Sequence, residues 1–77
     1  MFNPQDAASA ASTQADAITA KANTVNSSAL HFAGYYAHQS ASAAWSAIGT
    51  TTAKIAAHST QAQTHLTTAN QLKAAGK

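Results

Sequence analysis

The sequence predicts an all-α fold made of long, alanine-rich helices that pack side by side. Alanine, which has the highest intrinsic helix propensity, is the commonest residue, and the single proline, Pro4, stands near the start. Small and apolar residues recur at the three- and four-residue steps of coiled coils. The favoured architecture is one helical domain over residues 1–77, a helical hairpin with helices at about 4–33 and 38–75 and a turn or kink within 34–40.

The first helix is expected to begin at Pro4. Asn3 precedes it as a candidate N-cap, and proline suits the first helical position because its missing N–H would have no partner there. Asp6 lies in the first turn and Lys73 near the far end of the chain, so both charges suit the helix dipoles.

The first half of the chain carries a seam, meaning two sets of small or apolar residues that alternate like the a and d positions of a heptad. One set is Ala8, Ala15, Ala22, Ala29 and Tyr36, and the other is Ala11, Ile18, Val25 and Phe32. This seam predicts the packing face of the first helix.

The second half carries a second seam, with Trp45, Thr52, Ser59 and Leu66 in one set and Ala41, Ile48, Ile55, Ala62 and Ala69 in the other. Nine residues rather than seven separate Tyr36 from Trp45, so the two seams lie out of register on one straight helix. We therefore place a break between them, with Gly34 as the candidate helix stop. Trp45 occupies a seam position and is expected to be buried.

Two other arrangements stay open. Asn26, Ser27 and Ser28 are possible caps, and Gly49 followed by 50–52 could end one helix and start another, which gives a three-helix bundle. Against this, the second seam passes Gly49 without losing phase. A single long kinked helix is the remaining alternative, and it would be natural inside a bundle of several chains.

Four histidines are the residues that could bind a metal ion. His31 and His38, like His58 and His65, stand seven residues apart, which separates each pair by about 10.5 Å along a helix. One ion needs ligands three or four residues apart on a helix, so no metal site is predicted within the chain. We expect the histidines to be solvated polar positions beside the seams; the alternative is a ring of histidines in a symmetric oligomer, which could bind metal or repel on protonation.

Catalytic chemistry is not expected. Asp6 and Asp16 lie ten residues apart and glutamate is absent, so no carboxylate pair is available for acid–base catalysis. The chain also lacks a nucleophile elbow and a glycine-rich phosphate loop. The sequence predicts a protein without catalytic residues and without a cofactor.

Association with other helices is the expected activity. A chain of 77 residues with no cysteine has little core of its own, and alanine contributes little buried area. Its net charge of +2 opposes self-association only weakly. We therefore predict packing against copies of itself or a larger structural protein. The interface candidates are Ile18, Val25, Phe32, Tyr36, Trp45, Ile48, Ile55 and Leu66.

Other partners fit the composition less well. The chain has no arginine, so phosphate affinity is weak and specific nucleic-acid binding is not expected. Residues 22–53 carry no charged side chain, but histidine, glutamine and serine interrupt the apolar part, so no membrane span is expected.

The segments AASAASTQADA, SASAAW and AKIAAHSTQAQTHLTTA resemble the Ala/Ser/Thr/Gln-rich helical segments of bacteriophage tail-fibre and other virion proteins. The resemblance lies in composition and spans most of residues 7–70. It implies a non-enzymatic component of a phage particle, located in the virion and folded as a coiled coil or helical bundle.

Weaker resemblances suggest other functions. Trp45 and Gly49, in WSAIG, are similar to the Trp-x-Gly turn of small helical hairpins exported by type VII secretion systems. This implies an interaction module, secreted or cytoplasmic, that docks through a central aromatic patch, which comprises Leu30, Phe32, Tyr35, Tyr36, Trp45 and Ile48. The order of charges, with an acidic N-terminal part, an uncharged middle and a basic C-terminal end, resembles that of filamentous-phage coat subunits. The spacing of eleven residues between Thr13 and Thr24 resembles the threonine spacing of fish helical antifreeze proteins. A helix active at ice or membrane surfaces is accordingly the third hypothesis.

Overall fold

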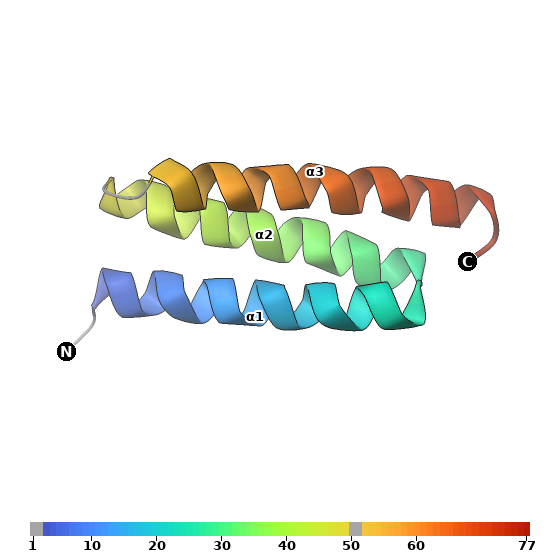
Figure 1. Ribbon diagram of the computed structural model, residues 1–77, viewed down its shortest axis with the longest axis horizontal. Helices are drawn as coiled ribbons and strands as arrows, with labels where there is room; N and C mark the ends of the chain where they lie inside the picture. Colours follow the sequence, from blue (N-terminus) through green and yellow to red (C-terminus); the bar gives the residue numbers. More distant parts are fainter. Residues whose placement is uncertain (1–2, 50–51) are drawn as a thin grey trace.

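The computed structural model describes residues 3–49 and 52–77, and the helices in these ranges are α1 (Pro4–Val25), α2 (Ser28–Ile48) and α3 (Thr52–Ala74). They run alternately up and down, so that neighbours in sequence are antiparallel (Figure 1). The predicted all-α class is confirmed. The predicted two-helix hairpin is wrong, because the chain forms a bundle of three helices.

The start of α1 follows local sequence chemistry. Asn3 has an extended backbone and its side chain accepts a hydrogen bond of 2.9 Å from the backbone N–H of Gln5, as an N-cap does. Pro4 is the first helical residue and Asp6 lies in the first turn. The predicted helix start is confirmed.

The first break lies at Asn26 and Ser27, not within 34–40. Asn26 adopts the left-handed conformation, with φ 60° and ψ 46°, and its N–H bonds the carbonyl of Ala22. Asparagine tolerates this conformation better than most residues, so it ends α1 as a C-cap. Ser27 is then extended and precedes α2. Gly34 stands inside α2, so it is not a helix stop.

The second break lies at Gly49. Its φ of 78° is left-handed, and its N–H bonds the carbonyl of Trp45 at 3.2 Å. Thr50 and Thr51, which the three-helix alternative invoked, lie outside the described residues. The alternative with three helices is thus the observed one, because two left-handed caps interrupt the helix although the heptad phase continues across one of them.

The end of α3 is closed by a Schellman motif. The N–H of Lys77 bonds the carbonyl of Leu72 at 2.8 Å, and the N–H of Gly76, which has a φ of 80°, bonds that of Lys73. The carbonyl of Lys77 accepts a bond of 3.3 Å from the N–H of Ser28. The end of the chain is therefore tied to the start of α2.

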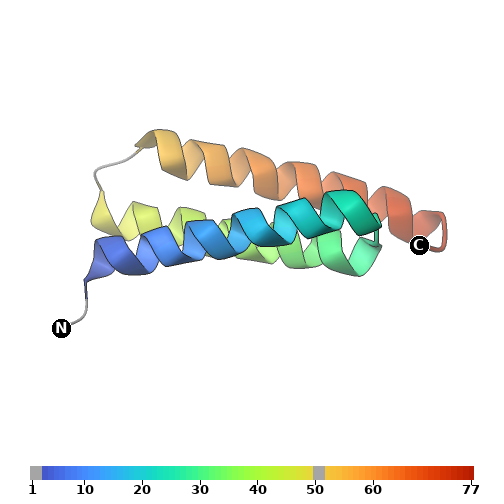
Figure 2. The same cartoon turned by 60° about the horizontal axis from the view of Figure 1, so that its bottom comes forward.

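Helix α2 is the central helix of the bundle. It packs against α1 on one side and α3 on the other, whereas α1 and α3 approach each other less closely (Figures 1 and 2). The Cα positions extend over 44 × 20 × 13 Å, so the three helices form a long, thin body. No helix in the described ranges has the length and hydropathy that a membrane span requires.

Small side chains and imidazoles fill the centre of this bundle. The buried alanines are Ala8, Ala15 and Ala22 on α1, Ala41 on α2, and Ala62 and Ala69 on α3. The rest of the core comes from Trp45, Gly34 and the four histidines. Six of the eight alanines of the predicted seams are therefore in the core, whereas Ala11 is half-buried, Ala29 is exposed and most bulky residues of the seams lie outside the core.

Candidate functional site

All four histidines are buried. The relative exposures are 4% for His31, 0% for His38, 7% for His58 and 4% for His65. The prediction that they are solvated positions beside the seams is wrong. Since α1 ends at Val25 and α2 at Ile48, each helix takes its own rotation, and the histidines share the buried faces of α2 and α3 with alanine.

The histidines pair across the α2–α3 interface. Nδ1 of His31 lies 2.8 Å from Nδ1 of His65, and Nδ1 of His38 lies 2.8 Å from Nδ1 of His58. Each bond requires a proton on Nδ1 of one ring and a free Nδ1 on the other. The spacing of seven within each helix is thus not the relevant one, because each histidine meets its partner on the neighbouring helix.

Hydroxyl groups of α1 hold the outer nitrogens of these rings. Thr19 Oγ1 lies 2.6 Å from Nε2 of His38 and 2.9 Å from Nε2 of His65. Ser12 Oγ lies 2.8 Å from Nε2 of His58 and accepts a bond of 2.7 Å from the indole N–H of Trp45. Helix α1 thereby contacts α3 through side chains.

These bonds join seven side chains into one continuous path, which we call the histidine chain. Its order is Trp45, Ser12, His58, His38, Thr19, His65 and His31. If Ser12 donates to His58, every later link can donate in the same direction, and the last proton then sits on Nε2 of His31. That Nε2 is buried and has no hydrogen-bond partner among the described residues. With all four rings neutral, every ring nitrogen of the histidine chain therefore has a hydrogen-bond partner except Nε2 of His31.

Burial and mutual proximity favour the neutral form of His38 and of His65. Burial lowers the pKa of His38 below its ordinary value of 6.5; the neighbouring His58 and His65 lower this pKa further, and the carboxylate of Asp16 opposes them. Burial also lowers the pKa of His65, as does His31. The His38 ring stacks on His58 and His65 with centroids 5.0 and 5.5 Å away, so a second positive charge here is costly.

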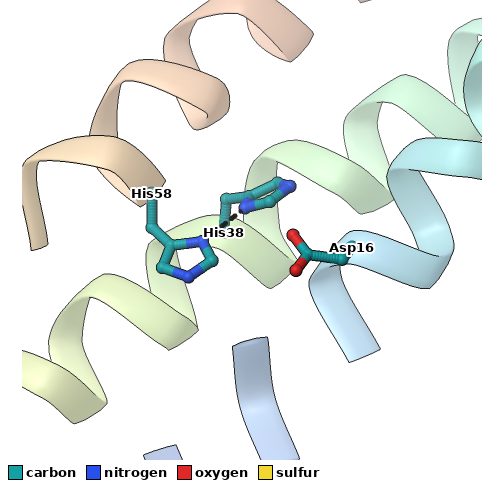
Figure 3. Close-up of side chains that lie close together, drawn as sticks. All are labelled: Asp16, His38 and His58. Carbon is teal, nitrogen blue, oxygen red and sulfur yellow. Dashed lines mark hydrogen bonds between the residues drawn. The ribbon is translucent and has the colours of Figure 1, made fainter. Parts of the chain in front are cut away.

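Asp16 stands beside the centre of the histidine chain. One carboxylate oxygen of Asp16, one nitrogen of His38 and one nitrogen of His58 lie within 4.8 Å of one another (Figure 3). Ser12, Asp16 and Thr19 are four and three residues apart, which places them on one face of α1. That spacing was the available signal in the sequence, but it points to histidines only once α2 and α3 are in place.

A polar cavity of about 250 Å³ lies beside the open end of the histidine chain. It is lined by Thr19, Asn23, Asn26, His31, Gln61, Thr64, His65 and Thr68. No charged side chain is part of this lining.

The predicted interface residues are distributed unevenly. Trp45 is buried, with 2% exposure, as expected, and Lys54 Nζ lies 4.1 Å from the centre of its ring. Val25 and Tyr36 are 56% and 63% exposed. The half-buried members are Ile18, Phe32, Ile48, Ile55 and Leu66. One predicted residue of the eight thus enters the core of the single chain.

No protein-family model, no curated protein and no solved structure matches this chain.

Proposed function

We propose that this chain is a non-enzymatic packing component of a phage particle, which associates with copies of itself through apolar side chains that one bundle leaves uncovered. The observation that carries the proposal is the position of the predicted interface residues. Seven of the eight, all except Trp45, are exposed or half-buried. Burial in a neighbouring copy would remove this apolar surface from water.

The composition of the core also supports association with other copies. Alanine and histidine bury less apolar area than leucine or isoleucine, so the hydrophobic stabilisation of a single chain is small. The bulky side chains that could add to it, among them Val25 and Tyr36, lie at the surface. Association would supply burial that the isolated bundle lacks.

A second copy is the favoured partner because of charge. The chain has four lysines, two aspartates and a net charge of +2, so two identical surfaces repel each other weakly. A surface rich in serine, threonine and glutamine also suits the polar rim of an interface. A larger structural protein of the particle is the alternative partner.

The location in a virion rests on the resemblance to helical segments of phage proteins. It is tested by mass spectrometry of purified particles, which should contain the chain at stoichiometric amounts. Absence from the particles would remove this part of the proposal and leave association to be judged separately.

The association is tested by sedimentation of the wild type, Val25→Ser and Tyr36→Ser over a range of micromolar concentrations. We expect the wild type to form oligomers and both variants to shift towards the monomer while keeping their helicity, because both side chains are exposed. Ala57→Ser is the control, since position 57 is exposed and belongs to neither seam. A wild type that stays monomeric throughout would contradict self-association.

A second candidate function is an exported helical interaction module. Trp45 lies in the last turn of α2 and Gly49 is its C-cap, so WSAIG stands at the end of α2 that leads to α3. The module would dock through the aromatic patch around Phe32, Tyr35 and Tyr36, which are half-buried or exposed. A stable 1:1 heterodimer with a partner encoded beside it, in place of homo-oligomers, would favour this candidate.

A further inference from the structure

The two rings at the centre of the histidine chain are held with one nitrogen of each facing the other. Nδ1 of His38 and Nδ1 of His58 are 2.8 Å apart, and both side chains are buried. Their Nε2 atoms are bonded to hydroxyl groups of α1, at Thr19 and Ser12. These hydrogen bonds at Nε2 fix the orientation of each ring, as outer-shell hydrogen bonds orient the histidines of metal sites.

The hydroxyl partners suit a metal-binding state of both rings. A metal ligand must present a nitrogen without a proton, so both rings would carry their proton on Nε2. The hydroxyl oxygens of Thr19 and Ser12 can accept hydrogen bonds from these two Nε2–H groups, because a hydroxyl oxygen accepts as well as donates. Binding changes the tautomer of one ring and leaves the number of protons on the pair unchanged.

Asp16 supplies a third donor from the remaining helix. One of its carboxylate oxygens lies within 4.8 Å of one ring nitrogen of His38 and one of His58, and the side chain is exposed, so it is free to change rotamer towards an ion (Figure 3). It also supplies a negative charge beside two neutral ligands. Two imidazoles and one carboxylate, with a fourth position open to water, form a donor set that Zn²⁺ and neighbouring divalent ions accept.

We propose that Asp16, His38 and His58 form a binding site for a divalent transition-metal ion of the Zn²⁺ class. Zn–N bonds of about 2.0–2.1 Å place two tetrahedral ligand nitrogens about 3.3 Å apart, so the facing nitrogens need to separate by only ~0.5 Å. The rings stand on different helices, α2 and α3, and can separate through small side-chain rotations.

The ion would cross-link the bundle. Its ligands come one each from α1, α2 and α3, and α1 and α3 otherwise approach each other less closely than either approaches α2. Small domains with little apolar core often take such a link from a metal. This stabilisation of the bundle by the ion is independent of the association proposed above.

The test uses the full chain, freed of metal with a chelator that is then removed. Calorimetric titration with Zn²⁺ should show one ion per chain, and Co²⁺ should give the visible absorption of a tetrahedral site. Zn²⁺ should also raise the midpoint of thermal unfolding, since a ligand that binds only the folded state stabilises it. Sedimentation in excess chelator then tests association separately, so that either proposal can fail alone.

Variants assign the ion to this site. Asp16→Asn should weaken Zn²⁺ binding at least about tenfold, because loss of even an outer-shell partner typically costs 10–100-fold. Asp6→Asn is the matched control, since it makes the same charge change in the same helix away from the histidines. His58→Gln should abolish binding, and because that buried variant risks unfolding, the exposed Asp16 decides the matter. Equal Zn²⁺ affinity in Asp16→Asn and Asp6→Asn, or no saturable binding in the wild type, overturns the proposal.

Discussion

The imidazole of His65 lies against Gly34, where any larger residue would carry a side chain. A Cβ atom placed on Gly34 would stand 2.9 Å from Cδ2 of His65 and 3.0 Å from its Cγ and Nε2. The ring cannot easily withdraw, because its Nε2 is bonded to Thr19 and its Nδ1 to His31. Glycine at this position therefore makes room for a buried ring and does not end a helix.

Gly34→Ala is expected to lower the free energy of unfolding by roughly 1–3 kcal/mol, the usual cost of overpacking a core. Alanine alone favours a helix interior by about 1 kcal/mol, so a net loss would show that the contact with His65 outweighs helix propensity. The measurement is urea unfolding followed by circular dichroism.

The double variant Gly34→Ala with His65→Ala separates the clash from other effects. Once the ring is gone, alanine at position 34 should stabilise the helix, so the two changes should be strongly non-additive. A stabilising Gly34→Ala in the presence of His65 would contradict the close contact.

Trp45→Ala should be among the most damaging single substitutions. The side chain is 2% exposed, its N–H is bonded to Ser12, and Lys54 lies over its ring. Removal of a buried tryptophan typically costs about 3–5 kcal/mol, a large part of the stability of a small domain. Thermal unfolding and incorporation into the assembly measure the loss, with Ala57→Ser as the control that stays within about 0.5 kcal/mol. Equal stability of the two variants would show that Trp45 is not in the core.

Asn26 is expected to tolerate glycine but not alanine. Its left-handed backbone, with φ 60°, costs a residue with a Cβ roughly 1 kcal/mol unless asparagine or glycine occupies it. Asn26→Ala should therefore lower stability by about that amount, and Asn26→Gly should leave it nearly unchanged. The comparison variant is Ser27→Ala, because the Ser27 side chain makes no capping hydrogen bond. A stabilising Asn26→Ala would mean that α1 continues through this position.

Acid should destabilise the folded chain in a window set by the buried histidines. The pKa values of His38 and His65 lie below the ordinary 6.5 in the folded state, mainly because of burial. As the pH falls, the unfolded chain therefore binds protons before the folded chain does. The contribution of these neutral histidines to the free energy of unfolding is complete above pH 6.5 and is lost as the pH falls from 6.5 towards their pKa values in the folded state. Urea unfolding between pH 8 and 5, with a chelator present, measures it. A free energy of unfolding that stays constant over this range would contradict the buried, neutral chain.

Local chemistry made part of this fold predictable. Asn3 and Pro4 mark the start of α1. The three-helix alternative rests on Asn26 as a possible cap and Gly49 as a possible helix end, and both residues have a left-handed backbone in the structure. The preference for Gly34 as the break came from the phase of apolar residues. A left-handed cap ends a helix even where the heptad pattern of apolar residues continues beyond it. The continuous heptad pattern across Gly49 therefore did not indicate a continuous helix.

The sequence by itself determined the all-α class, the first helix start and the alanine face of α1 at Ala8, Ala15 and Ala22, because helix propensity, capping and heptad spacing act over a few residues. Only the tertiary structure decided that the histidines are core. Hydropathy treats a buried histidine like a solvated one, and the bonds that make burial possible come from other helices: His58 to His38, and Thr19 to His65. Such pairings depend on the rotation of each helix about its own axis, which the two caps fix and which no single segment encodes.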